Sequence, residues 1–367
     1  MKKLSVLAAA LLLLLAGCTL PTTSNTNTNN AEPEAKPALI APVHEDEDEA
    51  EAAPAPLPKD PLTGEILEED NSINRPYAVV IDNARAALPA RGVGDAGVIF
   101  EYNVEGNVTR FLALFQSIEG IGSIGAVRSC RRIDVSLNLA FDGIFTHAGG
   151  SPEGLNDIIV KHVADLDAVY GNYRFFYRDN TRRANGYEHT LFTRTDQMEQ
   201  LVPGVKVTRG MEHEEDYKCC LQFGTPDMSK GTEAVAITVK MNSSKSTRFD
   251  YDEASGNYLV SEFADPFIDA NTDEQVAVKN VLALKLGYTV IEGDKYGRLA
   301  ADLTSGDGTY CTGGKIIKIK WSFTEESGFA FTYEDGSPLK LAAGKSFICM
   351  PDKESGGVEA SYLISRN

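Results

Sequence analysis

The stretch AGVIFEYNVEGNVTRFLALFQS (residues 96–117) contains two apolar runs rich in aromatic and β-branched residues, separated by the polar segment EGN. Runs of this length and composition predict β-strands, here within 96–105 and 109–117. Two further runs of the same kind, YAVVID (77–82) and DGIFTHAGG (142–150), lie on either side of it. This part of the chain therefore contributes at least four strands to one sheet.

Two segments near these strands carry a helical pattern instead. CRRIDVSLNLAF (130–141) places Ile133, Leu137 and Ala140 on one face, and PEGLNDIIVKHV (152–163) does the same with Leu155, Ile159 and Val163. Because the helices interrupt a series of strands, residues 73–205 are predicted to form a mixed α/β domain.

The remainder of the chain consists mostly of strand-like runs. Gly, Asp and Ser separate these runs every ten to fifteen residues, which is typical of an antiparallel sheet. We therefore predict an α+β protein of two domains, with a mainly antiparallel β domain over 234–355 and a connection over 206–233. The predicted strands lie in AVAITVKMN, STRFDYD, GNYLVSEF, KNVLALKL, KIIKIKWSF, GFAFTYEDG and KSFICM.

The amino terminus, MKKLSVLAAALLLLLAGCTL, has two lysines, a short apolar run and then Leu-Ala-Gly-Cys. The run is too short for a stable membrane span and is flanked as in a signal peptide. Its end resembles a bacterial lipobox, so we predict a signal peptide over 1–17 and lipidation of Cys18. The lipid would anchor the protein to the membrane, on the outer face of the cytoplasmic membrane.

Residues 18–72 are rich in Thr, Asn, Pro, Ala and acidic residues and lack aromatic residues, which predicts a disordered tether. Thirteen acidic residues and two lysines between Cys18 and Asp70 supply about −11 of the net charge of −18. The acidic balance argues against nucleic acid as a partner. Arginines gather elsewhere, with twelve arginines and one lysine between Arg75 and Arg194.

Two segments of the first domain share one design. GAVRS (125–129) and THAGGS (146–151) are each a glycine-containing loop that leads into a predicted helix. Each has a basic or titratable side chain at the junction. Helix amino termini favour anions, and Ser129 and Ser151 are suited to cap these helices. The alternative is that these residues only start helices and pair with neighbouring acids. The candidate ligand-binding residues are Arg110, Arg128, Ser129, Arg131, His147, Gly149, Gly150, Ser151 and His189.

Other groups have alternatives of their own. Cys130 lies among arginines, which would stabilise a thiolate, but small buried cysteines are common. The segment 173–193 contains tyrosines and phenylalanines interspersed with arginines. It could form a recognition surface, or it could be a loop packed on the core. Five cysteines follow Cys18, an odd number, and a disulfide between Cys311 and Cys349 is one option.

Catalytic and cofactor motifs are absent from the sequence: there is no G-x-S-x-G, phosphate-binding Gly-Lys motif or H-E-x-x-H. DANTDE (269–274) begins like a calcium loop, but Glu274 and Asn280 occupy positions that need glycine and glutamate. His213 with Cys219 and Cys220 lacks a metal-binding spacing. We therefore expect no metal and no cofactor, and name no catalytic residue.

Several motifs together resemble the YerB-like family of bacterial lipoproteins. In the first domain they are NRPYAVVIDN, FEYNVEGNVTRFLALFQS, IGAVRSCRR, THAGGSPEG and YEHTLFT, and in the second FDYDEASGNYLV, VAVKNVLAL, KIIKIKWSF and GSPLKLAAGKSFICMP. The resemblance implies two domains of unknown function in an extracytoplasmic protein, chiefly of Gram-positive bacteria. It implies no reaction.

Three hypotheses follow for function. The first is a lipid-anchored binding or accessory protein of the cell envelope, whose first domain holds an anionic or sugar-containing ligand derived from the cell wall. The second is an envelope-polymer hydrolase or transferase, with His147 as acid or base and Glu101 or Glu105 as its partner. The third is a protein-interaction module that binds an envelope protein. We favour the first, and leave enzymatic activity undecided but unfavoured.

Overall fold

A computed structural model describes residues 57–171, 173–200, 212–213, 217 and 220–361. The predicted signal peptide, Cys18 and the tether up to residue 56 lie outside the described residues, as does part of the predicted connection. Within the described residues no helix has both the length and the apolar character needed to cross a membrane.

The residues that the structure describes begin at residue 57, within the predicted tether of 18–72. Lys59 forms a β-bridge with Ile66, and the amide of Gly344 donates to the Thr63 carbonyl at 2.8 Å. Leu62 is 1% exposed and packs against Gly97. The prediction of disorder is therefore wrong for residues 57–72: one buried leucine and the backbone bonds of its turn hold this segment on the domain.

The N-terminal region, residues 77–198, is a mixed α and β structure, as predicted. Strand β1 pairs antiparallel with β3 and parallel with β4, and β4 pairs parallel with β5. The elements are β1 (Tyr77–Asn83), β2 (Val98–Asn103), β3 (Thr109–Phe115), α1 (Arg132–Ala140), β4 (Ile144–His147), α2 (Pro152–Val160), β5 (Asp165–Asp167), β6 (Phe176–Arg178), β7 (Leu191–Thr193) and α3 (Thr195–Met198), with short 3-10 helices at Arg85–Ala87, Val93–Asp95, Glu105–Asn107, Tyr173–Phe175, Asn180–Asn185 and Tyr187–His189.

The C-terminal region consists of strands in the described residues. Most of its pairs are antiparallel, as predicted, but β22 lies parallel to both of its neighbours. The strands are β8 (Thr232–Glu233), β9 (Ala236–Lys240), β10 (Ser246–Asp252), β11 (Asn257–Glu262), β12 (Asp265–Pro266), β13 (Ile268–Asp269), β14 (Glu274–Gln275), β15 (Ala277–Val278), β16 (Asn280–Leu284), β17 (Gly287–Val290), β18 (Leu299–Asp302), β19 (Ser305–Thr312), β20 (Lys315–Thr324), β21 (Gly328–Tyr333), β22 (Ser346–Met350) and β23 (Gly357–Ser361).

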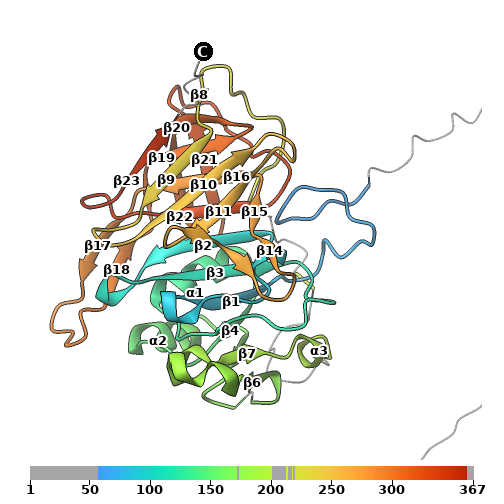
Figure 1. The fold of residues 1–367 in the computed structure, drawn as a ribbon, viewed down its shortest axis with the longest axis vertical. Helices are drawn as coiled ribbons and strands as arrows, with labels where there is room; N and C mark the ends of the chain where they lie inside the picture. Colours follow the sequence, from blue (N-terminus) through green and yellow to red (C-terminus); the bar gives the residue numbers. More distant parts are fainter. Residues whose placement is uncertain (1–56, 172, 201–211, 214–216, 218–219, 362–367) are drawn as a thin grey trace, which may run out of the picture. The chain divides into compact units, whose positions relative to one another are not determined.

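One large sheet runs through both regions. Its strands follow the order β21-β20-β19-β16-β22-β2-β3-β1-β4-β5, with β8 added to β20. The junction is the parallel pair of β22 with β2, in which Phe347 lies opposite Ile99. In Figure 1 the cyan β2 and β3 lie beside β22 of the C-terminal region. The two regions are therefore joined by backbone hydrogen bonds, which the separate strand patterns did not predict.

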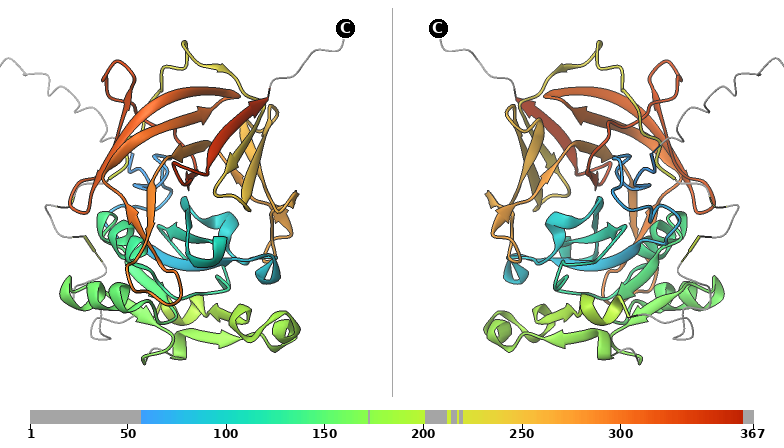
Figure 2. Two further views of the ribbon diagram at one scale, coloured as in Figure 1. Left: turned by 90° about the vertical axis from the view of Figure 1, so that its left-hand side faces the viewer. Right: turned by 90° about the vertical axis from the view of Figure 1, so that its right-hand side faces the viewer.

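The large sheet carries a different layer on each face. One face packs against a smaller sheet of order β12-β11-β10-β9-β23, and we call this the sheet-side core; it includes Ile99, Phe111, Phe249 and Phe347. The other face packs against α1 and α2, and this helix-side core includes Phe100, Leu112, Ile133 and Leu137. Figure 2 shows the green helices and the yellow and orange strands separated by the cyan strands.

The predicted helix faces have different outcomes. Ile133, Leu137 and Ala140 of α1 are all buried, as predicted. For α2 the prediction is right in part: Leu155 and Val163 pack against the helix-side core, but Ile159 is 71% exposed and Ile158 is buried in its place. Gly154 and Asp157 share the buried side with Ile158. The helix thus turns a small and a polar residue inward, which a hydrophobic pattern does not reveal.

The optional disulfide between Cys311 and Cys349 is not present, since both are free buried thiols. They lie on β19 and β22, which flank β16 on its two sides. Strands two apart in a sheet lie roughly 10 Å apart, which is beyond the reach of a disulfide.

Candidate functional site

The predicted site residues gather at one edge of the large sheet. This edge is formed by the carboxyl ends of β1, β4 and β5 and the amino end of β3. The segment around Arg128 runs extended between β1 and residues 148–150, because the Arg128 amide donates to Val80 O at 2.9 Å and Ala148 N donates to Arg128 O at 3.0 Å. Cys130 N donates to Gly149 O at 2.9 Å. The two loops of the same design thus lie side by side.

Three arginines, Arg110, Arg128 and Arg131, lie near one another here; we call them the arginine cluster. Arg110 is 6% exposed and donates to the Ser129 carbonyl. Burial, together with the positive charges of Arg131 and Arg128, lowers the pKa of Arg110. This repulsion indicates that the cluster concentrates positive potential at the edge of the sheet.

The acidic residues around the arginine cluster neutralise its positive charges unevenly. Arg131 pairs with Glu105, and although burial opposes it, this pairing lowers the pKa of Glu105 to about 2. Asp82 accepts from His189 Nδ1 at 2.7 Å and lies 3.4 Å from Arg128 Nε. Arg128 Nε is buried and makes no hydrogen bond among the described residues. Arg128 is therefore the member of the cluster with the greatest capacity for another acceptor.

The helix starts differ from the prediction in one case. Ser129 does not cap α1, which begins two residues later than that cap requires. The residue that precedes the helix, Arg131, is its N-cap, and the Arg131 amide donates to Asp134 Oδ2 at 2.6 Å. Ser151 does cap α2, accepting from Gly154 N at 3.1 Å, with Pro152 in the first turn. Side chains of the protein itself thus occupy amides that we expected an anion to use.

The two glycines also have internal neighbours. Gly149 has a φ of 61°, and its amide donates to Asp167 Oδ1 at 2.8 Å. A Cβ on Gly150 would lie 2.4 Å from Cys130 Sγ. The cysteine therefore fills the space over Gly150, and the need for glycine at this position comes from packing.

His147 is completely buried at the end of β4. Its Nδ1 lies 2.9 Å from Gly149 O and its Nε2 lies 3.3 Å from Asp165 Oδ2. Burial favours the neutral ring, but Asp165, Cys130 and Asp167 outweigh it and raise the pKa from 6.5 to about 10. The imidazole is thus a buried cation at neutral pH.

We expect this charge to make the stability contribution of His147 depend on pH. Because the pKa is raised in the folded state, the contribution is complete below pH 6.5 and is lost as the pH rises towards about 10. Urea unfolding across this range should show the difference between wild type and His147→Gln decreasing with pH. His162→Gln, at an exposed position, controls for loss of a histidine. A difference that stays constant with pH would contradict the assignment.

Asp165 and Asp167 bring two carboxylates within 4.8 Å of a ring nitrogen of His147, close enough for one metal ion. The parallel register of β4 and β5 produces this grouping, since His147 lies opposite Asp167. A metal would first have to displace the imidazole proton, because only the neutral ring is a ligand.

The second hypothesis, catalysis by His147 with Glu101 or Glu105, does not agree with the geometry. Side chains alternate along a strand, so Glu101 points to the same face as Ile99, towards the sheet-side core. His147 shares the opposite face with Phe145, whose ring it stacks on at 4.8 Å. Glu105, in turn, is paired with Arg131. Neither predicted carboxylate therefore contacts His147.

The arginines of the 173–193 segment mostly stack on aromatic rings close to them in sequence. The guanidinium of Arg178 lies 3.8 Å from the centre of the Tyr187 ring, and that of Arg183 lies 5.5 Å from the same ring. The phenylalanines of the segment are buried, as the packed-loop alternative requires, whereas Tyr173 and Tyr187 are exposed.

A groove lies beside the arginine cluster, with a cavity volume of about 400 Å³. It is bounded by the start of α1, by the Ser151 turn and by the β17–β18 hairpin of the C-terminal region. Arg298 of this hairpin contacts Glu153 at 3.5 Å and Asp294 at 3.0 Å. The lining residues are Arg131, Arg132, Ile133, Ser136, Ser151, Glu153, Thr289, Val290, Ile291, Glu292, Arg298, Leu299, Ala300, Ala301 and Leu303.

The sequence did not single out Asp82, Asp165 or Asp167, although each contacts a predicted residue or its backbone. Asp82 could have been recognised from the sequence, because it is the acidic residue that ends the apolar run YAVVID. Asp165 and Asp167 lie on a strand of three residues, too short for a pattern to predict.

The fold and the site define a class of protein. It is an α+β chain in which two sequence regions share one sheet, with a buried arginine cluster at the edge of that sheet. The chain belongs to the DUF3048 family, a family of proteins of unknown function: its N-terminal domain model matches residues 62–208 and its C-terminal domain model matches 237–348.

Two comparisons extend this finding. A Bacillus subtilis (strain 168) protein named as a candidate lipoprotein, YerB, is 29% identical over 306 residues, which cover 82% of this chain and 88% of that protein. The crystal structure of the YerB protein from Bacillus subtilis superimposes with a TM-score of 0.71 at 26% identity, covering 82% of this chain and 99% of that one. The predicted YerB-like family and two-domain α+β fold are thereby confirmed.

Proposed function

We propose that this protein is a lipid-anchored, extracytoplasmic binding protein of the bacterial cell envelope. The anchor is supported by the Leu-Ala-Gly-Cys sequence ending at Cys18 and by the name of the YerB relative. The acidic residues after Cys18 would hold the folded part away from an anionic membrane surface.

The ligand proposed for the N-terminal region is anionic or contains sugar, such as a fragment of the cell wall. The observation that carries this proposal is the groove, because Arg131, two residues after the first predicted loop, and Ser151 at the end of the second both line it. Its lining combines arginines and hydroxyls with aliphatic side chains, which suits a ligand having both polar groups and apolar ring faces. Arg128 does not line the groove, but its side chain is 23% exposed and adds a positive charge at the same edge of the sheet.

Binding of wall-derived muropeptides and of inorganic phosphate to the full chain, measured by calorimetry, tests the proposal. Ala300→Trp places a large ring in the groove from an exposed position on β18 and should abolish muropeptide binding. Ala330→Trp, also at an exposed strand position but outside the groove lining, is the matched control and should bind normally.

Arg128→Ala should weaken binding of the anionic probes about tenfold or more, since a hydrogen bond to a charged group contributes about 1.5–3 kcal/mol. Arg248→Ala, which removes an exposed arginine paired with Asp250, should leave binding unchanged. Absence of binding by wild type, or equal binding by wild type, Ala300→Trp and Arg128→Ala, would refute the proposal.

A further inference from the structure

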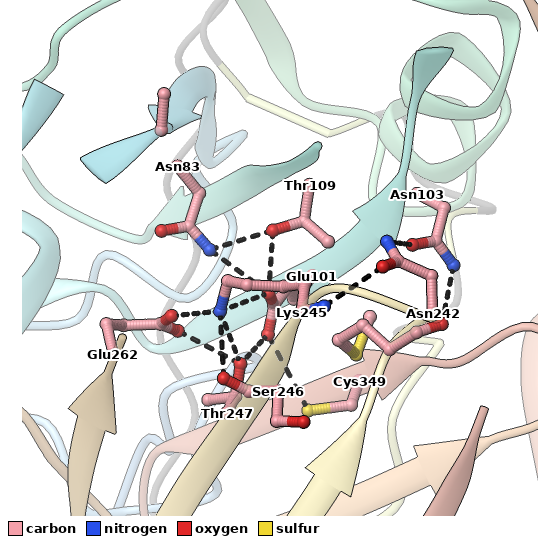
Figure 3. A network of polar contacts seen from close by, with 12 residues as sticks. Asn83, Glu101, Asn103, Thr109, Asn242, Lys245, Ser246, Thr247, Glu262 and Cys349 are labelled. Atoms are coloured by element: carbon pink, nitrogen blue, oxygen red, sulfur yellow. Dashed lines mark hydrogen bonds and ion pairs between the residues drawn. The ribbon is translucent and has the colours of Figure 1, made fainter. Parts of the chain in front are cut away.

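A second charged group lies in the interior, on the opposite face of the sheet from the arginine cluster. It consists of Glu101 on β2, Lys245 just before β10 and Glu262 at the end of β11, which are 0%, 5% and 1% exposed. Figure 3 shows the Lys245 nitrogen between the two carboxylates. No part of the proposed ligand site includes these residues.

The contacts within this group are close. Lys245 Nζ contacts Glu262 Oε2 and lies 3.2 Å from Glu101 Oε1. The Thr247 hydroxyl lies between the same groups, 2.6 Å from Glu101 Oε2 and 3.1 Å from Glu262 Oε1. The amine and both carboxylates are therefore held together by the strands on which they lie.

Glu101 is also fixed from its other side. Asn83 Nδ2 donates to Glu101 Oε1 at 3.0 Å and the Thr109 hydroxyl donates to it at 2.8 Å. These two contacts hold Glu101 Oε1 in place beside the Lys245 amine, the position that a proton acceptor for this amine requires.

The charges do not balance if both carboxylates are ionised, because Lys245 is the only cation in contact with them among the described residues. Burial and the charge of Glu101 raise the pKa of Glu262. This shift favours the protonated carboxyl, which is the form that an amine can attack.

We propose that Lys245 and Glu262 condense to form an intramolecular amide, with Glu101 as the catalytic proton acceptor. Three conditions for the reaction are met in one place: the reacting groups are in contact, a carboxylate lies beside the amine, and the site is closed to bulk water. Fixed proximity replaces the activation that amide formation otherwise needs. The product also removes two charges from a low-dielectric interior, where separated charges are costly.

The step balances without another reactant. The Lys245 ammonium gives one proton to Glu101, and the free amine attacks Cδ of the protonated Glu262 carboxyl, forming the N–C bond. The C–O bond to the Glu262 hydroxyl breaks, and this hydroxyl leaves as water with a second proton from the nitrogen. Glu101 remains protonated and can donate to the oxygen of the new amide.

The amide would close the chain between residues 245 and 262 and fasten the start of β10 to the end of β11. In the folded state these ends are already neighbours, since Thr247 lies opposite Glu262. The link would provide a covalent constraint in a chain whose Cys130, Cys311 and Cys349 are all free thiols.

Tryptic peptide mapping of the purified full chain tests the proposal. Trypsin cuts after lysine and arginine, so an unmodified chain yields 241–245, 246–248 and 249–279. The amide blocks cleavage at Lys245 and joins 241–248 to 249–279, with a mass one water below the sum of the two peptides. We expect this joined species; recovery of only the separate peptides from folded protein would overturn the proposal.

Two comparisons sharpen the result. Lys161 Nζ lies 2.6 Å from Glu325 Oε1, but their side chains are 30% and 36% exposed, so this pair should yield only separate peptides. Glu101→Gln leaves Lys245 and Glu262 in place and removes the proton acceptor, so it should give the separate peptides from 241–279. A joined species that persists in folded Glu101→Gln would overturn the role assigned to Glu101.

Discussion

Replacing Lys245 with methionine should lower the free energy of unfolding by about 3–5 kcal/mol, the range observed when one partner of a buried ion pair is removed. The substitution leaves Glu101 and Glu262 in the interior without a cation, and it also removes the amine that the proposed amide requires. Urea unfolding followed by circular dichroism measures the change.

The matched control is Lys230→Met. Lys230 pairs with Asp335 at 3.4 Å, but their side chains are 82% and 55% exposed, and exposed pairs contribute little. Adding Glu101→Gln to Lys245→Met should recover part of the loss, because the buried carboxylate left without a cation is then replaced by a neutral amide. If Lys245→Met were no more destabilising than Lys230→Met, the buried group would have no energetic importance.

Phe347→Ala should cost about 3–5 kcal/mol, as large-to-small changes of phenylalanine in a core do. Phe347 is fully buried on β22, with its ring 5.1 Å from that of Phe249 and 5.8 Å from that of Phe111. Phe249 lies on the smaller sheet and Phe111 lies on β3 of the N-terminal region. The substitution therefore weakens the packing between the two sheets and also the packing between the two regions.

The same variant tests whether the two family regions unfold together. β22 pairs with β2 by backbone hydrogen bonds, so we expect one transition in wild type and one, at lower urea concentration, in Phe347→Ala. Tyr296→Ala, which removes a ring that is 62% exposed, should change the free energy of unfolding by less than about 0.5 kcal/mol. Two separate transitions in wild type would show that the regions are independent.

The strand and helix predictions succeeded where the local pattern is strong. YAVVID, TRFLALFQS and KIIKIKWSF all contain strands, because alternating or continuous apolar residues suit a sheet that is buried on one or both faces. Strand β19 (Ser305–Thr312) was missed, since its sequence SGDGTYCT contains glycines and polar residues. Its pairing with β16 and β20 places it in the sheet despite its composition.

The candidate site could be predicted in part. Basic or titratable residues beside glycine loops indicated Arg128 and His147, and the structure brings both to the edge of the sheet where Arg110 also lies. The acids that face them could not be predicted, since Asp82 and Asp165 lie far from Arg128 and His147 in the sequence and meet them only through strand pairing. Without these acids the charge state of His147 could not be inferred.

The sequence by itself determined the local elements, the division into a mixed region and a β-rich region, and the family, because these depend on residue patterns within short windows. Only the tertiary structure decided that β22 joins the two regions in one sheet, that Cys130 covers Gly150, and that Glu101 faces Lys245 rather than His147. The physical reason is that each of these contacts depends on the register and the face of a strand. A shift of one residue in register would turn each side chain to the opposite face of the sheet.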